Sequence, residues 1–109
     1  MDMSFQDAVE LYRKIVKRFE KIERKPWCAE SAMIELSKQV GELAKCIMIQ
    51  EDYYFFSGAG EENKKKLANE LADIFGQIIR IADHYQLDLL KAHIDARQEE
   101  DNILSQHGV

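Results

Sequence analysis

Apolar side chains recur at steps of three and four residues along most of the chain, and this spacing constrains the fold more than any other feature. Residues three and four apart share one face of an α-helix, so each such run predicts an amphipathic helix. The 109 residues include only five Gly and one Pro, which leaves few positions where a helix must stop. The sequence therefore predicts long helices rather than many short strands.

Four runs predict four helices. Ser4, with Asp7 three residues later, is a plausible N-cap of the first helix, and Pro26 follows that helix because proline cannot continue it. Residues 51–61 form a connector, and residues 105–109 are expected to fray. The expected helices run from about Ser4 to Arg24, from Glu30 to Gln50, from Glu62 to Tyr85 and, capped by Asp88, up to about Leu104.

Four helices joined by short links are typical of an all-α bundle, here a four-helix bundle protomer forming a single domain over residues 1–109. The second and third helices are predicted to pack against each other, because their apolar stripes are as regular as coiled-coil seams. A core of this size leaves the first helix's aromatic face uncovered, so self-association as a homodimer or dimer of dimers (a homotetramer) is expected. A monomeric bundle is the alternative. The two stripes are Met33, Leu36, Val40, Leu43 and Ile47, and Leu67, Leu71, Ile74, Ile78, Ile81 and Tyr85.

The composition indicates which classes of binding partner and which cellular compartment to expect. The net charge is −5, whereas proteins that hold nucleic acid present basic surfaces, so no nucleic-acid partner is expected. The longest apolar runs are four residues, far short of the roughly 20 that cross a bilayer, and the N-terminal residues do not resemble a signal peptide. Cys28 and Cys46 are expected to be free thiols. These features favour a cytoplasmic protein with no membrane partner.

Carboxylates follow the apolar stripes of the two central helices. If the stripes face each other, these acids converge at the edge of the interface, where two carboxylates about 4 Å apart repel by roughly 4 kcal/mol at an effective dielectric of 20. A divalent cation such as Mg²⁺ relieves this repulsion and accepts carboxylate oxygens. The alternative is an ordinary solvated flank. The polar rows are Glu35, Gln39, Glu42 and Cys46, and Lys66, Glu70, Asp73, Gln77, Arg80 and His84.

The strings ELSKQVGELAK (residues 35–45) and NELADIFG (residues 69–76) resemble the MazG-like family of all-α nucleotide pyrophosphohydrolases. That family carries Glu-x-x-Glu on one helix and Glu-x-x-Asp on the next, and the likeness covers roughly Trp27 to Ala92. The resemblance implies that Glu42, Glu70 and Asp73 are catalytic residues and Mg²⁺ ligands, with Mn²⁺ as an alternative ion. The implied activity is hydrolysis of a (deoxy)nucleoside triphosphate to the monophosphate and pyrophosphate.

Gln39 departs from the family pattern, which has glutamate at this position. Glutamine keeps one acceptor oxygen but loses the negative charge and the capacity to act as a base. Three interpretations stay open: Gln39 lends its carbonyl to the metal while Glu35 supplies charge, the chain is a divergent member with weak or altered activity, or the change was engineered to trap substrate. Glu35 lies about 10 Å along the axis from Glu42 at 1.5 Å per residue, which favours a second metal or a supporting role.

Further residues are candidates for binding the rest of the nucleotide. Trp27 lies where similar proteins place a base-stacking aromatic, although a core or interface role is equally consistent with its position. Lys45, Lys66 and Arg80 are candidate phosphate ligands, since a triphosphate needs cations besides the metal. The aromatic residues 53–56 are expected in a core or an interface. The competing function is a weakened or inactive MazG-like bundle that serves as a nucleotide-binding or protein-interaction module.

Overall fold

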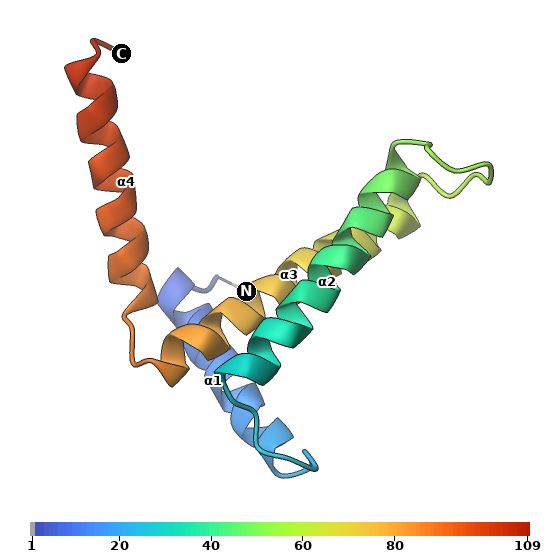
Figure 1. The fold of residues 1–109 in the computed structure, drawn as a ribbon, viewed down its shortest axis with the longest axis horizontal. Helices are drawn as coiled ribbons and strands as arrows, with labels where there is room; N and C mark the ends of the chain where they lie inside the picture. Colours follow the sequence, from blue (N-terminus) through green and yellow to red (C-terminus); the bar gives the residue numbers. More distant parts are fainter. Residues whose placement is uncertain (1) are drawn as a thin grey trace.

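The computed structural model describes residues 2–109, and over this range it is all-α (Figure 1). No strand occurs among these residues, which confirms the predicted fold class. None of the helices in this part of the chain is long and apolar enough to cross a membrane. The four helices are α1 (Phe5–Glu20), α2 (Ala29–Gln50), α3 (Glu61–His84) and α4 (Leu89–Gln106).

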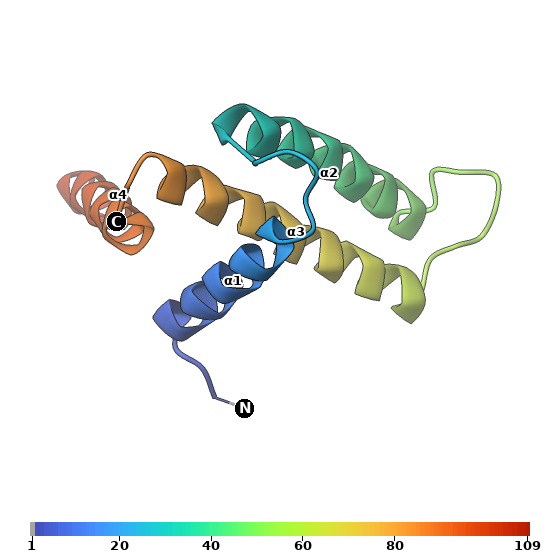
Figure 2. The same ribbon diagram turned by 90° about the horizontal axis from the view of Figure 1, so that it is seen from below.

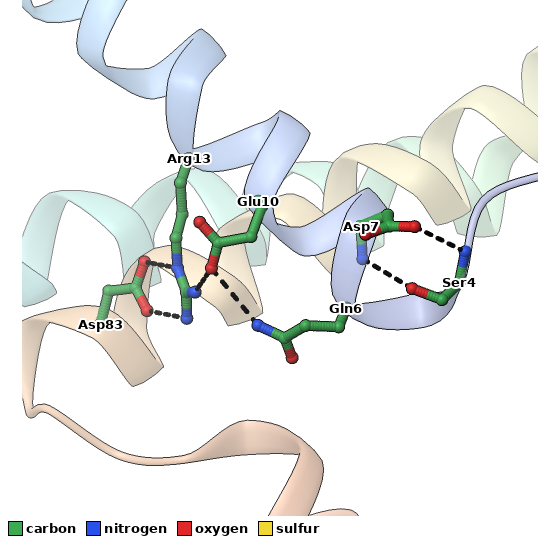
Figure 3. Close-up of polar contacts among 6 residues, drawn as sticks. All are labelled: Ser4, Gln6, Asp7, Glu10, Arg13 and Asp83. Carbon is green, nitrogen blue, oxygen red and sulfur yellow. Dashed lines mark hydrogen bonds and ion pairs between the residues drawn. The ribbon is translucent and has the colours of Figure 1, made fainter.

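The predicted N-caps of α1 and α4 are confirmed. The Ser4 hydroxyl accepts a hydrogen bond from the Asp7 backbone N–H at 3.0 Å, and the Asp7 carboxylate accepts one from the Ser4 N–H (Figure 3). The Asp88 carboxylate accepts from the Lys91 N–H at 3.0 Å. Each cap satisfies amide groups that the first turn of a helix leaves without partners.

Two helix ends differ from the prediction. α1 stops at Glu20 instead of near Arg24, because the amides of residues 22 and 23 both turn back to the Phe19 carbonyl, at 2.9 and 3.0 Å. α4 continues to Gln106, two residues beyond its predicted end near Leu104. The His107 amide closes this last turn by donating to the carbonyls of residues 103 and 104.

α2 and α3 lie antiparallel and side by side, as predicted, and form the main helix–helix contact (Figures 1 and 2). The face that α2 buries is nevertheless rotated from the expected stripe. α2 buries Ala32, Gln39 and Cys46, whereas Val40 and Ile47 of the predicted stripe remain about half exposed. The apolar stripe is wider than one helix contact, so α3 covers only one edge of it.

α1 packs on the other side of α3, and Figure 2 shows α2, α3 and α1 as successive layers. Gly76 permits this approach, because a Cβ atom there would lie 2.7 Å from the Tyr12 ring. The guanidinium of Arg13 donates two hydrogen bonds of 2.9 Å to the Asp83 carboxylate of α3 (Figure 3). Arg13 also forms an ion pair with Glu10 within α1.

The protomer buries little apolar surface. Its buried apolar residues are small on average, three of them alanine, and α4 extends away from the other helices beyond its first turn in Figure 1. The radius of gyration is 17.5 Å, against about 13 Å for a compact chain of this length. The accessible surface is 8784 Å², against about 6,200 Å² expected for a compact protein of this mass. The buried apolar residues are Val9, Ala29, Ala32, Cys46, Ile79 and Ala82.

Candidate functional site

Four of the residues predicted for the site line one shallow cavity between α2 and α3. Glu42 and Lys45 come from α2, and Lys66 and Glu70 come from α3. The cavity has a volume of about 440 Å³. With Lys65, it therefore combines two carboxylates and three primary amines from two neighbouring helices in one groove. The remaining lining residues are Cys46, Ile49, Asn63, Lys65 and Asn69.

Buried Asn63 fixes the register of the two helices beside this groove. Its side-chain amide donates to the Cys46 carbonyl at 2.8 Å and to the Gln50 side-chain oxygen at 3.0 Å. A buried amide with both partners in place holds the helices in one alignment, because any slip would leave polar groups unpaired. Glu70 lies two turns along α3 from Asn63, and Glu42 lies about two turns back along α2 from Gln50, so this alignment places both acids along the same groove.

Gln39 is buried beside the contact of α2 with α3, and its surroundings are partly polar. Its amide nitrogen donates to the Glu35 carboxylate at 3.4 Å, and Glu35 also pairs with Lys38 at 3.1 Å. The Gln39 side-chain oxygen is buried and has no hydrogen-bond partner within residues 2–109. A buried acceptor left in this state costs about 1–3 kcal/mol.

Asp73 is exposed and accepts a hydrogen bond from the Asn69 side chain at 3.3 Å. It lies one turn beyond Glu70 on α3 but does not line the α2–α3 groove, and neither do Gln39 and Glu35. Over the described part of the chain, no group of three or more His, Cys, Asp or Glu side chains is clustered closely enough to hold a metal ion. The two groove carboxylates nevertheless suit Mg²⁺, which often takes one or two carboxylates and completes its shell with water and substrate phosphates.

The other two predicted residues, Trp27 and Arg80, meet in a second cavity of about 730 Å³ between α1, α3 and the segment before α2. The Arg80 guanidinium carbon lies 4.6 Å from the centre of the Trp27 ring, a cation–π contact. Arg80 also pairs with Glu23 at 3.6 Å and donates to the Tyr12 hydroxyl at 3.3 Å. The Arg80 side chain is only 11% exposed, so it is held firmly against Trp27.

Glu23 and Tyr12 were not predicted as site residues. Glu23 has one carboxylate oxygen that is buried without a hydrogen-bond partner among the described residues. Both residues reach Arg80 across more than fifty positions of sequence, and helical spacing carries no signal for contacts of that range. Only the packing of α1 and the following turn on α3 brings them to this cavity.

Two ionisable groups near this second cavity are perturbed. The hydrogen bonds that Arg13 donates to the Asp83 carboxylate are the main reason that the pKa of Arg13, which lines the cavity, is raised above its ordinary value. A hydrogen bond that the Glu30 carboxylate accepts from the Cys28 side chain is the main reason that the pKa of exposed Glu30 is lowered. Both effects strengthen the charged forms that exist at neutral pH.

The two cavities share no lining residue. They are joined by one row on α3, since Glu70, Asp73, Gln77 and Arg80 follow each other at steps of three, four and three. Glu70 and Arg80 are separated by about 15 Å along the helix axis at 1.5 Å per residue.

Comparisons with protein families, with curated proteins and with solved structures give no match to this chain.

Proposed function

We propose that this chain is a MazG-like hydrolase that converts a (deoxy)nucleoside triphosphate to its monophosphate and pyrophosphate with Mg²⁺ as cofactor. The observation that carries the proposal is the α2–α3 groove, where Glu42 and Glu70 lie beside Lys45 and Lys66. Carboxylates hold the metal and amines hold phosphate oxygens, so this mixture suits a metal–triphosphate and not a metal alone.

Glu42 and Glu70 are the residues that would hold the ion, with Asp73 one turn beyond Glu70 and the unpaired oxygen of Gln39 as further candidate ligands. When bound, Mg²⁺ supplies neutralisation of charge on the phosphates and lowers the pKa of a coordinated water. Glu35, held by Lys38 and Gln39, supports the site from one turn further back.

Lys45 and Lys66 would bind the phosphates from the two sides of the groove. Trp27 would offer its ring to the base, since every nucleobase has a face that stacks on an aromatic side chain. Arg80 would fix the orientation of that ring through its cation–π contact. The common row along α3 supports a nucleotide that spans the two cavities.

Self-association belongs to the same proposal, as a homodimer or homotetramer. On α2, Val40 and Ile47 each follow a buried residue by one position. On α3, Ile78 follows buried Gln77 and Leu71 follows half-buried Glu70. Because α2 and α3 are antiparallel, residues that follow the contact face by one position on either helix point to the same side of the helix pair. The apolar residues of α2 and of α3 therefore form one surface. Such an exposed apolar surface favours association with another copy. The free thiols of Cys28 and Cys46 suit the reducing cytoplasm.

One observation favours a second candidate function, a module that binds nucleotides or proteins without hydrolysis. Gln39 stands where the resembled family has a glutamate, and its amide nitrogen is directed at Glu35. This amide carries no charge and cannot accept a proton from water. A site with the remaining acids could still bind a metal–nucleotide complex while turning it over slowly.

Product analysis of the full-length chain tests the proposal. A panel of ribo- and deoxynucleoside triphosphates is incubated with Mg²⁺ or with chelator, and the products are separated. We expect monophosphate and pyrophosphate from at least one substrate, and we expect both to disappear with chelator and in Asp73→Asn. Equal turnover with Mg²⁺ and with chelator contradicts the metal-dependent mechanism. Absence of turnover together with metal-dependent nucleotide binding supports the binding module instead.

A further inference from the structure

The cavity between α1, α3 and the segment before α2 contains a carboxylate whose hydrogen bonding is incomplete. The Glu23 side chain is only 13% exposed, and it pairs with the Arg80 guanidinium at 3.6 Å, which is longer than an ordinary hydrogen bond. Its other carboxylate oxygen is buried and has no hydrogen-bond partner within residues 2–109. A buried charged acceptor in this state is destabilising, so a donor supplied by a ligand would bind it favourably.

The Glu23 carboxylate lies beside the aromatic ring of the same cavity. The Arg80 guanidinium contacts both Glu23 and the face of Trp27, so it holds the acid and the ring next to each other. Trp27 is 37% exposed, which leaves part of its ring open to a ligand. The last torsion of a glutamate side chain is broad, so the carboxylate can turn an oxygen toward the cavity with little strain. The cavity therefore offers a stacking surface and a charged acceptor together.

The balance of charge distinguishes this cavity from the α2–α3 groove. As many Asp and Glu side chains as Lys and Arg side chains line the cavity. The groove is lined by three lysines and two glutamates, and bound Mg²⁺ would add two further positive charges. A triphosphate is strongly negative, so these charges favour the groove for the phosphates and leave the cavity for the uncharged base.

Nucleobases differ in what they present to a carboxylate. Cytosine, adenine and guanine each carry an exocyclic amino group that donates hydrogen bonds, and glutamate and aspartate accept from the amino group of cytosine in protein–DNA complexes. Uracil, thymine and hypoxanthine carry a carbonyl oxygen where cytosine and adenine carry the amino group. Their ring N–H beside this oxygen can donate, but the carbonyl next to it repels a carboxylate. A carboxylate beside a stacked base therefore favours bases with an amino group.

We propose that Glu23 determines base specificity by accepting a hydrogen bond from the exocyclic amino group of a base that stacks on Trp27. The substrates are then nucleotides of cytosine, adenine or guanine, whereas those of uracil, thymine and hypoxanthine bind weakly. The inference rests on the nucleotide site proposed above but not on hydrolysis. Base preference without turnover of any triphosphate would contradict the enzymatic proposal alone.

Fluorescence titration of the full-length chain in chelator tests the specificity without turnover, because Trp27 is the only tryptophan and reports on its own cavity. CMP is compared with UMP, and AMP with IMP, since the members of each pair differ in whether one ring position carries an amino group or a carbonyl. Wild type is expected to bind CMP and AMP at least about tenfold more tightly than UMP and IMP. Equal affinities within either pair, or no binding of any of the four nucleotides, overturn the proposal.

Two matched substitutions test the role of Glu23 itself. A carboxamide both donates and accepts, so Glu23→Gln suits an amino group and a carbonyl alike, and the CMP-to-UMP preference is expected to fall to within about threefold. Glu20→Gln removes the same charge from an exposed acid that lines the same cavity and is expected to keep the preference. A preference that survives Glu23→Gln, or that falls equally in Glu20→Gln, overturns the proposal. The wild-type comparison decides the base class even if Glu23→Gln fails to fold.

Discussion

At the scale of single residues, Gln39 is the position where this chain departs from the glutamate of the family that it resembles. It is buried next to Glu35, and its side-chain oxygen is left without a hydrogen bond among the described residues. A glutamate at this position would have nearly the same shape, but it would replace the donor NH₂ group with a second acceptor oxygen and add a negative charge. The acid would face the Glu35 carboxylate, to which the Gln39 amide donates, so a bound cation would have to offset the repulsion between the two acids.

Gln39→Glu is expected to raise Mg²⁺-dependent turnover at least about tenfold, because an additional carboxylate strengthens metal binding and the electrostatic stabilisation that the metal provides. Steady-state release of pyrophosphate measures the change. Gln77→Glu is the matched control, since Gln77 is also buried on the neighbouring helix and also has an unpaired side-chain oxygen. Equal turnover in the two variants, with helical content retained, contradicts the role assigned to position 39.

At the scale of helices, the crossing of α1 over α3 depends on one glycine. A Cβ on Gly76 would lie 2.7 Å from the Tyr12 ring, whereas a Cβ on Gly41 of α2 would meet nothing within 4 Å. These two helical glycines have the same low helix propensity and opposite steric surroundings. Substituting each glycine in turn therefore distinguishes the steric effect of a new Cβ atom from the effect of alanine on helix propensity.

Gly76→Ala is expected to lower the free energy of unfolding by about 1–3 kcal/mol, the usual cost of forcing extra volume into a packed contact. Gly41→Ala is expected to raise it by about 0.5–1 kcal/mol, because alanine is the better helix former and has open space there. Urea unfolding followed by circular dichroism measures both. Stabilisation by Gly76→Ala would show that α1 does not pack on α3 as described.

The elements themselves follow from local information. Apolar spacing predicted four helices, and the residues Ser4 and Asp88 marked where two of them begin, because capping is decided within one turn of the chain. The buried face of α2 was not predictable in the same way. Its apolar stripe is wide enough for two contacts, and only the neighbouring helix determines which edge is covered.

Part of the candidate site was likewise predictable from local sequence, and part was not. Helical spacing predicted that acids of α2 and α3 would approach each other, and Glu42 and Glu70 do share a groove. Spacing could not predict the cluster of Trp27, Arg80 and Glu23, since these residues meet only when the turn after α1 folds onto α3. Local periodicity determines which residues share a face of a helix. Packing between segments far apart in the sequence determines which side chains from different helices meet.

At the scale of the whole molecule, the protomer is open and its main groove lies between α2 and α3. This pair is the only part of the described chain with an extensive helix–helix contact, so it provides the rigid support that a metal–phosphate site requires. We propose that the carboxylates of this groove, and not acidic residues in general, support metal-dependent hydrolysis.

Turnover of the substituted full-length chains tests that claim most directly. Glu42→Gln and Glu70→Gln are compared with Glu99→Gln, an exposed acid on α4, in both the wild-type and the Gln39→Glu background. We expect the groove substitutions to reduce Mg²⁺-dependent pyrophosphate release at least about 100-fold, and we expect Glu99→Gln to retain it, because loss of a metal ligand removes several kcal/mol of charge stabilisation. Full activity in Glu42→Gln and Glu70→Gln, or no metal-dependent turnover in either background, would contradict the claim.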